Sequence, residues 1–135
     1  MNEVYEFLKK CGTYYLATVD SDGQPRNRPF GTINIFEGKL YIQTGKSKDV
    51  SKQIHKNPKV EICCFDSASG VWLRVAGELY DDDRREARAD MLDHYPELKN
   101  MYSPDDGNTE AFCFKEGTVT ATFSSFTGAP KVVKF

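Results

Sequence analysis

Short apolar stretches separated by turn-forming residues run through most of the chain, and only a few segments show a helical spacing. Residues 2–10 suit an amphipathic helix, because Val4, Leu8 and Cys11 share one helical face. The stretches that follow are rich in β-branched and aromatic residues and therefore predict strands. Strands are expected at residues 13–19, 25–36, 40–44, 60–65, 71–80, 111–114 and 118–124, followed by a short tail at residues 131–135.

The segment after the third predicted strand favours a helix over residues 47–56. Val50 and Ile54 share one helical face, which we expect to pack against the body of the protein. The helix should end at Asn57, because a residue that precedes proline disfavours helical backbone geometry.

A third helix is expected to open at Asp83. This residue and Glu86 have the spacing of a capping box, in which each side chain bonds a free backbone amide at the helix start. Pro96 should interrupt the helix. Its apolar stripe consists of Ala87, Met91, Leu92 and Tyr95.

The order of these elements indicates the fold class. Many sequential strands with few helices favour a small antiparallel barrel, closed or nearly closed, over a parallel sheet. A chain of 135 residues is long enough to bury one core. We therefore predict a mainly β protein, a β-barrel with peripheral helices, that forms a single domain over residues 1–135.

Composition and charge narrow the classes of partner. Hydrophobic residues make up 39% and charged residues 28% of the chain, as in ordinary folded proteins. The formal net charge of -2 and the pI near 5.7 give no general attraction to nucleic acid or to an anionic membrane. The chain also lacks a run of about 18 apolar residues that could span a bilayer. These features indicate a cytoplasmic protein with neither nucleic acid nor membrane as a partner.

The cysteines and histidines do not form a motif. None of the four cysteines forms a CxxC pair, and His55 and His94 lie far apart in sequence, so we expect neither a metal site nor disulfides. Cys63 and Cys64 should point to opposite faces of a strand, and no histidine lies beside them in sequence to activate a thiol. His55 near a helix end is interpreted as a favourable charge rather than as a base.

Two arginines in the second predicted strand are the first candidates for binding chemistry. Arg26 and Arg28 are two residues apart and therefore share a face, which by itself is typical of a solvated surface. Pro29 changes the interpretation, because proline cannot donate to a sheet ladder and is confined to edges and bulges. Gly31 would let a flat ligand approach the main chain closely. An arginine beside such an opening suits a phosphate or a ring carbonyl.

A basic turn after the third predicted strand is the second candidate. Ser47 is a plausible N-cap that leaves free amides at the helix start, where an anion is favoured, and Lys46 and Lys48 add charge. The alternative is a capped surface helix with solvated lysines. A hairpin at residues 37–38 brings the two strands together, so we expect Arg28 and this turn to converge.

The order of these features resembles the pyridoxamine 5′-phosphate oxidase-like flavoproteins, which are split β-barrels that bind FMN at a homodimer interface. The matching features are Arg28-Pro29, a hairpin, a strand ending in Thr44, the Ser47-Lys48 turn, and a helix that closes on Asn57-Pro58-Lys59-Val60. The match is best over residues 13–80. Among the shorter members of the family, the chain is most similar to the nitroimidazole-resistance and general-stress types.

The resemblance assigns the cofactor a set of residues in this chain. Arg28 would bind the FMN phosphate or ribityl region, and the four residues after it would run along the flavin. Ser47 and Lys48 would hold the phosphate. Trp72 lies where a second subunit reaches the cofactor, with core or dimer packing as an equal alternative. The matching positions are Arg28, Pro29, Phe30, Gly31, Thr32, Gln43, Thr44, Lys46, Ser47, Lys48 and Trp72.

The resemblance also implies a function. It implies an FMN-dependent oxidoreductase, active as a homodimer, with NAD(P)H as donor and a small-molecule acceptor such as a nitroaromatic. Oxidation of pyridoxamine phosphate itself is not expected, because Ile33 stands where those oxidases carry a basic residue. Two alternatives stay open: a flavin-binding or haem-binding sensor or carrier without turnover, and a deazaflavin-dependent reductase.

Overall fold

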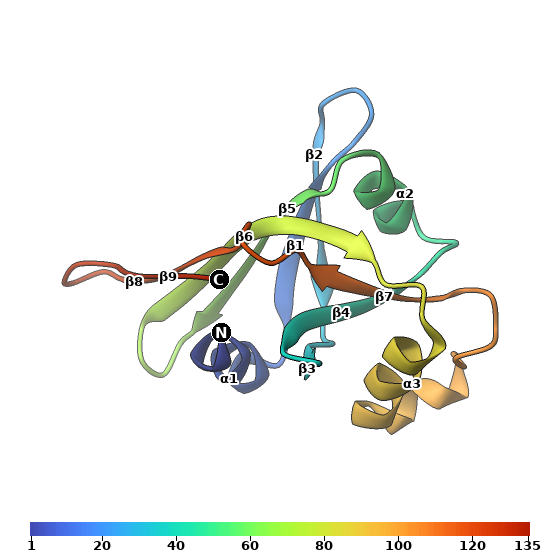
Figure 1. Ribbon diagram of the computed structural model, residues 1–135. Helices are drawn as coiled ribbons and strands as arrows, with labels where there is room; N and C mark the ends of the chain where they lie inside the picture. Colours follow the sequence, from blue (N-terminus) through green and yellow to red (C-terminus); the bar gives the residue numbers. More distant parts are fainter.

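The computed structural model describes residues 1–135, which form three α-helices, one 3-10 helix and nine strands (Figure 1). All the strand pairs are antiparallel. The helices are α1 (Asn2–Cys11), α2 (Asp49–Lys56), α3 (Arg85–His94) and the 3-10 helix η1 (Pro96–Asn100). The strands are β1 (Tyr14–Val19), β2 (Pro25–Phe30), β3 (Asn34–Phe36), β4 (Lys39–Gly45), β5 (Lys59–Asp66), β6 (Val71–Asp81), β7 (Thr109–Phe114), β8 (Thr120–Ser125) and β9 (Lys131–Lys134).

The long strand β6 divides the barrel. Along one side it pairs with β5, while its other side pairs first with β8 and then with β7. The main path of the sheet runs β2-β1-β5-β6-β7-β4-β3, so that β2 and β3 are its two edges. The chain itself connects these edges through residues 31–33. The result is the split, antiparallel barrel that the sequence predicted.

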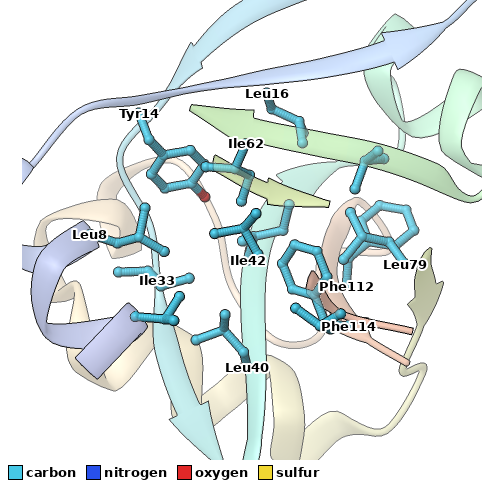
Figure 2. Packing of buried hydrophobic residues seen from close by; sticks show 14 of the residues in the cluster. Leu8, Tyr14, Leu16, Ile33, Leu40, Ile42, Ile62, Leu79, Phe112 and Phe114 are labelled. Carbon is cyan, nitrogen blue, oxygen red and sulfur yellow. The ribbon is translucent and has the colours of Figure 1, made fainter. Parts of the chain in front are cut away.

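Apolar side chains from the inner faces of the strands fill the barrel (Figure 2). Their alternation along the strands follows from the two-residue repeat of β structure, and it explains why Cys64 is buried while Cys63 is exposed, as expected. Helix α1 contributes Val4 and Leu8 to this cluster, whereas α3 packs outside β3, β4 and β7. No helix is long and apolar enough to cross a membrane.

The prediction of one strand over residues 25–36 is wrong, because the chain leaves the sheet between β2 and β3. Strand β2 pairs with β1, and β3 pairs with β4, so the two pieces belong to opposite edges. Pro29 does lie on an edge strand, as its missing amide required. The intervening residues bond to side chains instead of to a ladder, as described below.

Both predicted helix caps are also wrong. Helix α2 begins at Asp49 with Lys48 in the N-cap position, and the amide of Ser47 donates to the side-chain oxygen of Asn108 (3.0 Å). Helix α3 begins at Arg85, and its N-cap residue makes no side-chain cap. Asp83 accepts from Arg88 instead (2.9 Å). Arg88 thus takes the carboxylate that would have capped α3, whereas at α2 the bond to Asn108 holds Ser47 in the turn before the helix.

Candidate functional site

A hollow of about 490 Å³ lies beside the break in the sheet edge, and its volume is in the range of small-molecule sites. One wall is the end of β2 and the segment after it, together with the end of β4 and the N-cap of α2. The other wall is the helix η1 with the residues on either side of it. The lining residues are Pro29, Phe30, Gly31, Thr32, Gln43, Thr44 and Lys48 on the first wall, and Tyr95, Glu97, Leu98, Met101 and Tyr102 on the second.

Side-chain hydrogen bonds hold the first wall in place. The buried Tyr14 hydroxyl donates to the carbonyl of Thr32 (2.6 Å), and burial raises the pKa of Tyr14 well above its usual value, so the hydroxyl remains a donor. The Thr32 hydroxyl accepts from the amide of Gln43 (3.0 Å). The Tyr95 hydroxyl accepts from the amide of Ile33 (3.0 Å) and donates to its carbonyl (2.9 Å). Residues 31–33 are thereby kept rigid outside the sheet.

The second wall was not predicted from the sequence. The apolar spacing predicts Tyr95 on the stripe of the third helix, and Pro96 predicts only the end of that helix. In the structure Pro96 also opens η1, a position that proline favours because its missing amide is not needed there. The turn of η1 places Leu98 and Met101 on the hollow, and Met101 is 72% exposed. The start signal at Pro96 was available in the sequence.

The hollow has one cationic end. Lys48 lies on its wall at the N-terminus of α2 and makes no salt bridge. The preceding turn is tied to β7 by Asn108, whose carbonyl accepts from the amide of Lys46 (2.7 Å). A lysine and the first amides of a helix favour an anion at the same place. Glu97 supplies the only carboxylate among the lining residues.

Seven of the eleven residues expected at the cofactor therefore line one hollow, and Arg28 is not among them. Its guanidinium donates to the side chains of Thr18 (2.7 Å) and Gln53 (2.7 Å) and to the carbonyl of Leu16 (3.2 Å). Partial burial lowers the pKa of Arg28, and Asp49 opposes this shift. Arg28 thus joins β2 to β1 and α2.

The remaining expected residues lie elsewhere. Lys46 lines a separate polar hollow with Asp83, and their charged groups are 3.9 Å apart. Ser47 is exposed and is held by its amide. Trp72 lies on the outer face of β6, where its ring centroid is 5.1 Å from that of Phe126. Within one chain, Trp72 is not on the wall of the 490 Å³ hollow.

The hollow combines aromatic and aliphatic side chains, main chain at Gly31, amide groups at Gln43 and a cationic end. This set suits a flat ligand that carries an anionic group. A second hollow, beside Gln53, has no apolar lining residue and therefore offers no surface on which a ring could pack. Its lining residues are Asp20, Ser21, Asp49, Lys52, Gln53 and Lys56.

Comparisons with known proteins bear on the family and the fold. The family model for pyridoxamine 5′-phosphate oxidase matches residues 1–123. A NimC/NimA family protein from Clostridium acetobutylicum is 45% identical, with a TM-score of 0.91 over 98% of this chain and 90% of that one. A protein from the same organism related to general stress protein 26 shares the fold at 17% identity (TM-score 0.76, 98% and 92% covered).

A haem-binding protein from Mycobacterium smegmatis also shares the fold, at 15% identity and a TM-score of 0.71, over 96% of this chain and 57% of that one. No curated protein matches the chain. At least one protein that shares this fold is thus a haem-binding protein.

Proposed function

The chain belongs to the pyridoxamine 5′-phosphate oxidase family, and we propose that it is an FMN-binding oxidoreductase that uses a nicotinamide donor and a small-molecule acceptor. The observation that carries the proposal is the hollow between residues 29–32 and η1. Its mixed apolar and amide lining fits an isoalloxazine ring, and Lys48 with the start of α2 fits a phosphate. The 45% identity to a NimC/NimA family protein supports the same class.

The protein residues in this proposal bind and orient. Residues 29–32 present main chain to the ring, and the Tyr14 and Tyr95 hydroxyls keep that main chain from moving. Gln43 faces the same hollow with an amide that can pair with ring oxygens or nitrogens. The flavin, when bound, supplies the hydride chemistry, so the chain needs no acid–base pair of its own.

Flavin is favoured over haem by the lining residues. The hollow offers neither histidine nor cysteine, the residues that hold haem iron in globins and P450s. The Tyr95 hydroxyl is already bonded to Ile33, which leaves Met101 and Tyr102 as the lining side chains able to ligate iron. A flavin-type absorption spectrum of the purified protein supports the proposal, and a Soret band would point to haem instead. A deazaflavin is distinguished by its shorter-wavelength absorption and by mass spectrometry of the released cofactor.

A matched pair of substitutions tests the anion end. Lys48→Ala removes a charge-assisted contact and should weaken FMN binding about 10-fold to 100-fold, equivalent to about 1.5–3 kcal/mol. Lys56→Ala, at the other end of α2 and outside the hollow, should leave the affinity unchanged. Equal effects in the two variants would refute the assignment. Adding Arg28→Ala to Lys48→Ala then shows whether Arg28 contributes, as the family resemblance implies.

We also propose that the protein acts as a homodimer through the outer face of β1, β5, β6 and β8. This face carries Tyr15 and Phe65, which are 50% and 53% exposed, together with Trp72. The strand register places Phe65 opposite Trp72, so the aromatic side chains are contiguous. A second copy would cover them and could bring Trp72 to the hollow. Light scattering should give a dimer, and Phe65→Glu should shift it to monomer.

Turnover separates an enzyme from a carrier. Bound flavin should be reduced anaerobically by NADH or NADPH and reoxidised by small electrophiles such as nitroaromatics. Loss of the flavin absorbance measures the reduction, and its return measures the reoxidation. Binding of FMN without reduction by either donor would favour a carrier or sensor and would reject the oxidoreductase proposal.

A further inference from the structure

Three neighbouring strands change from apolar to polar at the same level of the barrel interior. Residues two apart on a strand share a face, so the inward series of β4 passes from Ile42 to Thr44, and that of β7 passes from Phe112 to Glu110. The register pairs Thr44 with Glu110 across these strands. On β6 the same change occurs from Leu79 to Asp81, and Asp81 is paired with Phe112. One end of the barrel is therefore lined by polar groups.

Helix α2 covers this polar end. His55 Nε2 is 2.6 Å from Glu110 Oε2, and the Ser51 hydroxyl donates to Glu110 Oε1 (2.5 Å). The side chain of Glu110 is fully buried, whereas that of His55 is 49% exposed. The ring centroid of Phe112 lies 5.5 Å from that of His55. Ser51 thus holds the buried Glu110 carboxylate in place, and the partly exposed His55 connects that carboxylate to solvent.

We propose that His55, Asp81 and Glu110 bind a divalent transition-metal ion, with Zn²⁺ as the preferred ion. One donor atom from each of the three residues lies within 4.8 Å of the others. An imidazole with two carboxylates is a donor set that zinc accepts and that leaves a further position for water. The exposed edge of His55 provides the route by which an ion enters.

Charge and hydrogen bonding support the assignment. Asp81 and Glu110 face each other at the end of an apolar barrel, where His55 and Ser51 contact Glu110 and Lys46 acts on Asp81 from a distance. A dication between the carboxylates would offset the cost of burying them. Ser51 fixes the second oxygen of Glu110, as outer partners of metal ligands commonly do. The Thr44 hydroxyl is buried without a hydrogen-bond partner on the same face of the sheet, directly opposite Glu110. The Thr44 hydroxyl can form a hydrogen bond with one of the ligating side chains or with a water molecule bound to the ion.

The site is distinct from the proposed flavin hollow. None of the three ligands lines that hollow, and Thr44 is the only residue involved in both descriptions. Metal binding can therefore be measured whether or not the protein binds flavin. The expected role is structural, since the ion would join α2 to β6 and β7 and so stabilise the helix that has Lys48 as its N-cap.

The test is a metal titration of the full chain after treatment with a chelator. Competition with a chromophoric chelator should give one Zn²⁺ per chain, and Co²⁺ should give the visible absorption of a low-coordinate site. Ca²⁺ and Mg²⁺, which prefer oxygen ligands alone, should not compete. His55→Ala and Asp81→Asn should each weaken Zn²⁺ binding at least about 10-fold, because each removes one of three ligands.

Two controls separate this site from other donors. His94→Ala removes the second histidine, which bonds a carbonyl on α3, and should leave Zn²⁺ affinity unchanged. Cys63→Ser removes the exposed thiol and should do the same. The proposal is overturned if wild type binds no stoichiometric Zn²⁺, if both ligand variants retain wild-type affinity, or if either control loses it. Circular dichroism checks that each variant is folded. Because the side chain of His55 is half-exposed, His55→Ala is the ligand variant expected to disturb folding least.

Discussion

The substitution Tyr95→Phe removes both hydrogen bonds between the Tyr95 hydroxyl and Ile33, together with a long, exposed one from Lys9 Nζ (3.5 Å). The hydroxyl bonds both the amide and the carbonyl of Ile33, a residue that is only 2% exposed. A typical hydrogen bond contributes about 1 kcal/mol net, and a buried group left unpaired costs about 1–3 kcal/mol. Because the adjoining hollow lets water reach part of the segment, we expect the free energy of unfolding to fall by about 2 kcal/mol. For a chain of this length that corresponds to about 7 °C in Tm.

Urea denaturation at equilibrium, followed by circular dichroism, measures this change directly. Tyr102→Phe is the matched control, because Tyr102 lines the same hollow and its hydroxyl makes no hydrogen bond within the chain. The control should stay within about 0.5 kcal/mol of wild type. The reasoning fails if Tyr95→Phe is equally neutral or if both variants lose the same stability. Weaker FMN binding in Tyr95→Phe alone would further show that the rigid wall matters for the ligand.

Two other substitutions test packing and electrostatics. Gly77→Ala should cost about 1–3 kcal/mol by overpacking, measured by urea denaturation, because a Cβ there would lie 3.0 Å from a ring carbon of Phe114. Hydrogen bonds from Ser69 and Lys10 lower the pKa of Asp66 to about 2, so its ionised form stabilises the fold above the unfolded pKa of about 4. The stability advantage of wild type over Asp66→Asn should therefore be complete near neutral pH and shrink as the pH falls from about 4 toward 2. An advantage that did not depend on pH would contradict the assignment.

The local pattern of apolar and polar residues was sufficient to predict most of the helices and strands and the fold class. The two-residue alternation of apolar positions located the strands and placed Cys63 and Cys64 on opposite faces, because a strand has no other way to bury one side. Proline chemistry correctly assigned Pro29 to an edge. The ordered features of residues 24–58 also indicated the family, since they combine several local signals in one sequence order.

Apart from the cap at Asp83, which Arg88 takes from five residues away, the errors arose where a group distant in the sequence competed with a local signal. The break between β2 and β3 depends on Tyr14 and Tyr95, whose hydroxyls bond the main chain of residues 31–33. The sequence around residues 31–33 contains no pattern that predicts a hydrogen bond with Tyr95, about sixty positions further along the chain. The turn expected to be capped by Ser47 is instead organised by Asn108, which is distant in the sequence but directly precedes the neighbouring strand β7.

The sequence by itself determined the barrel, its helices and the first wall of the candidate site, because those depend on spacing between near neighbours. Only the tertiary structure placed η1 opposite that wall and moved Arg28 into bonds with Gln53. Only it brought His55 to Asp81 and Glu110, which the search for clustered histidines and cysteines could not find. The physical reason is the same in each case: packing of the helices against the barrel joins residues whose separation along the chain carries no periodic signal.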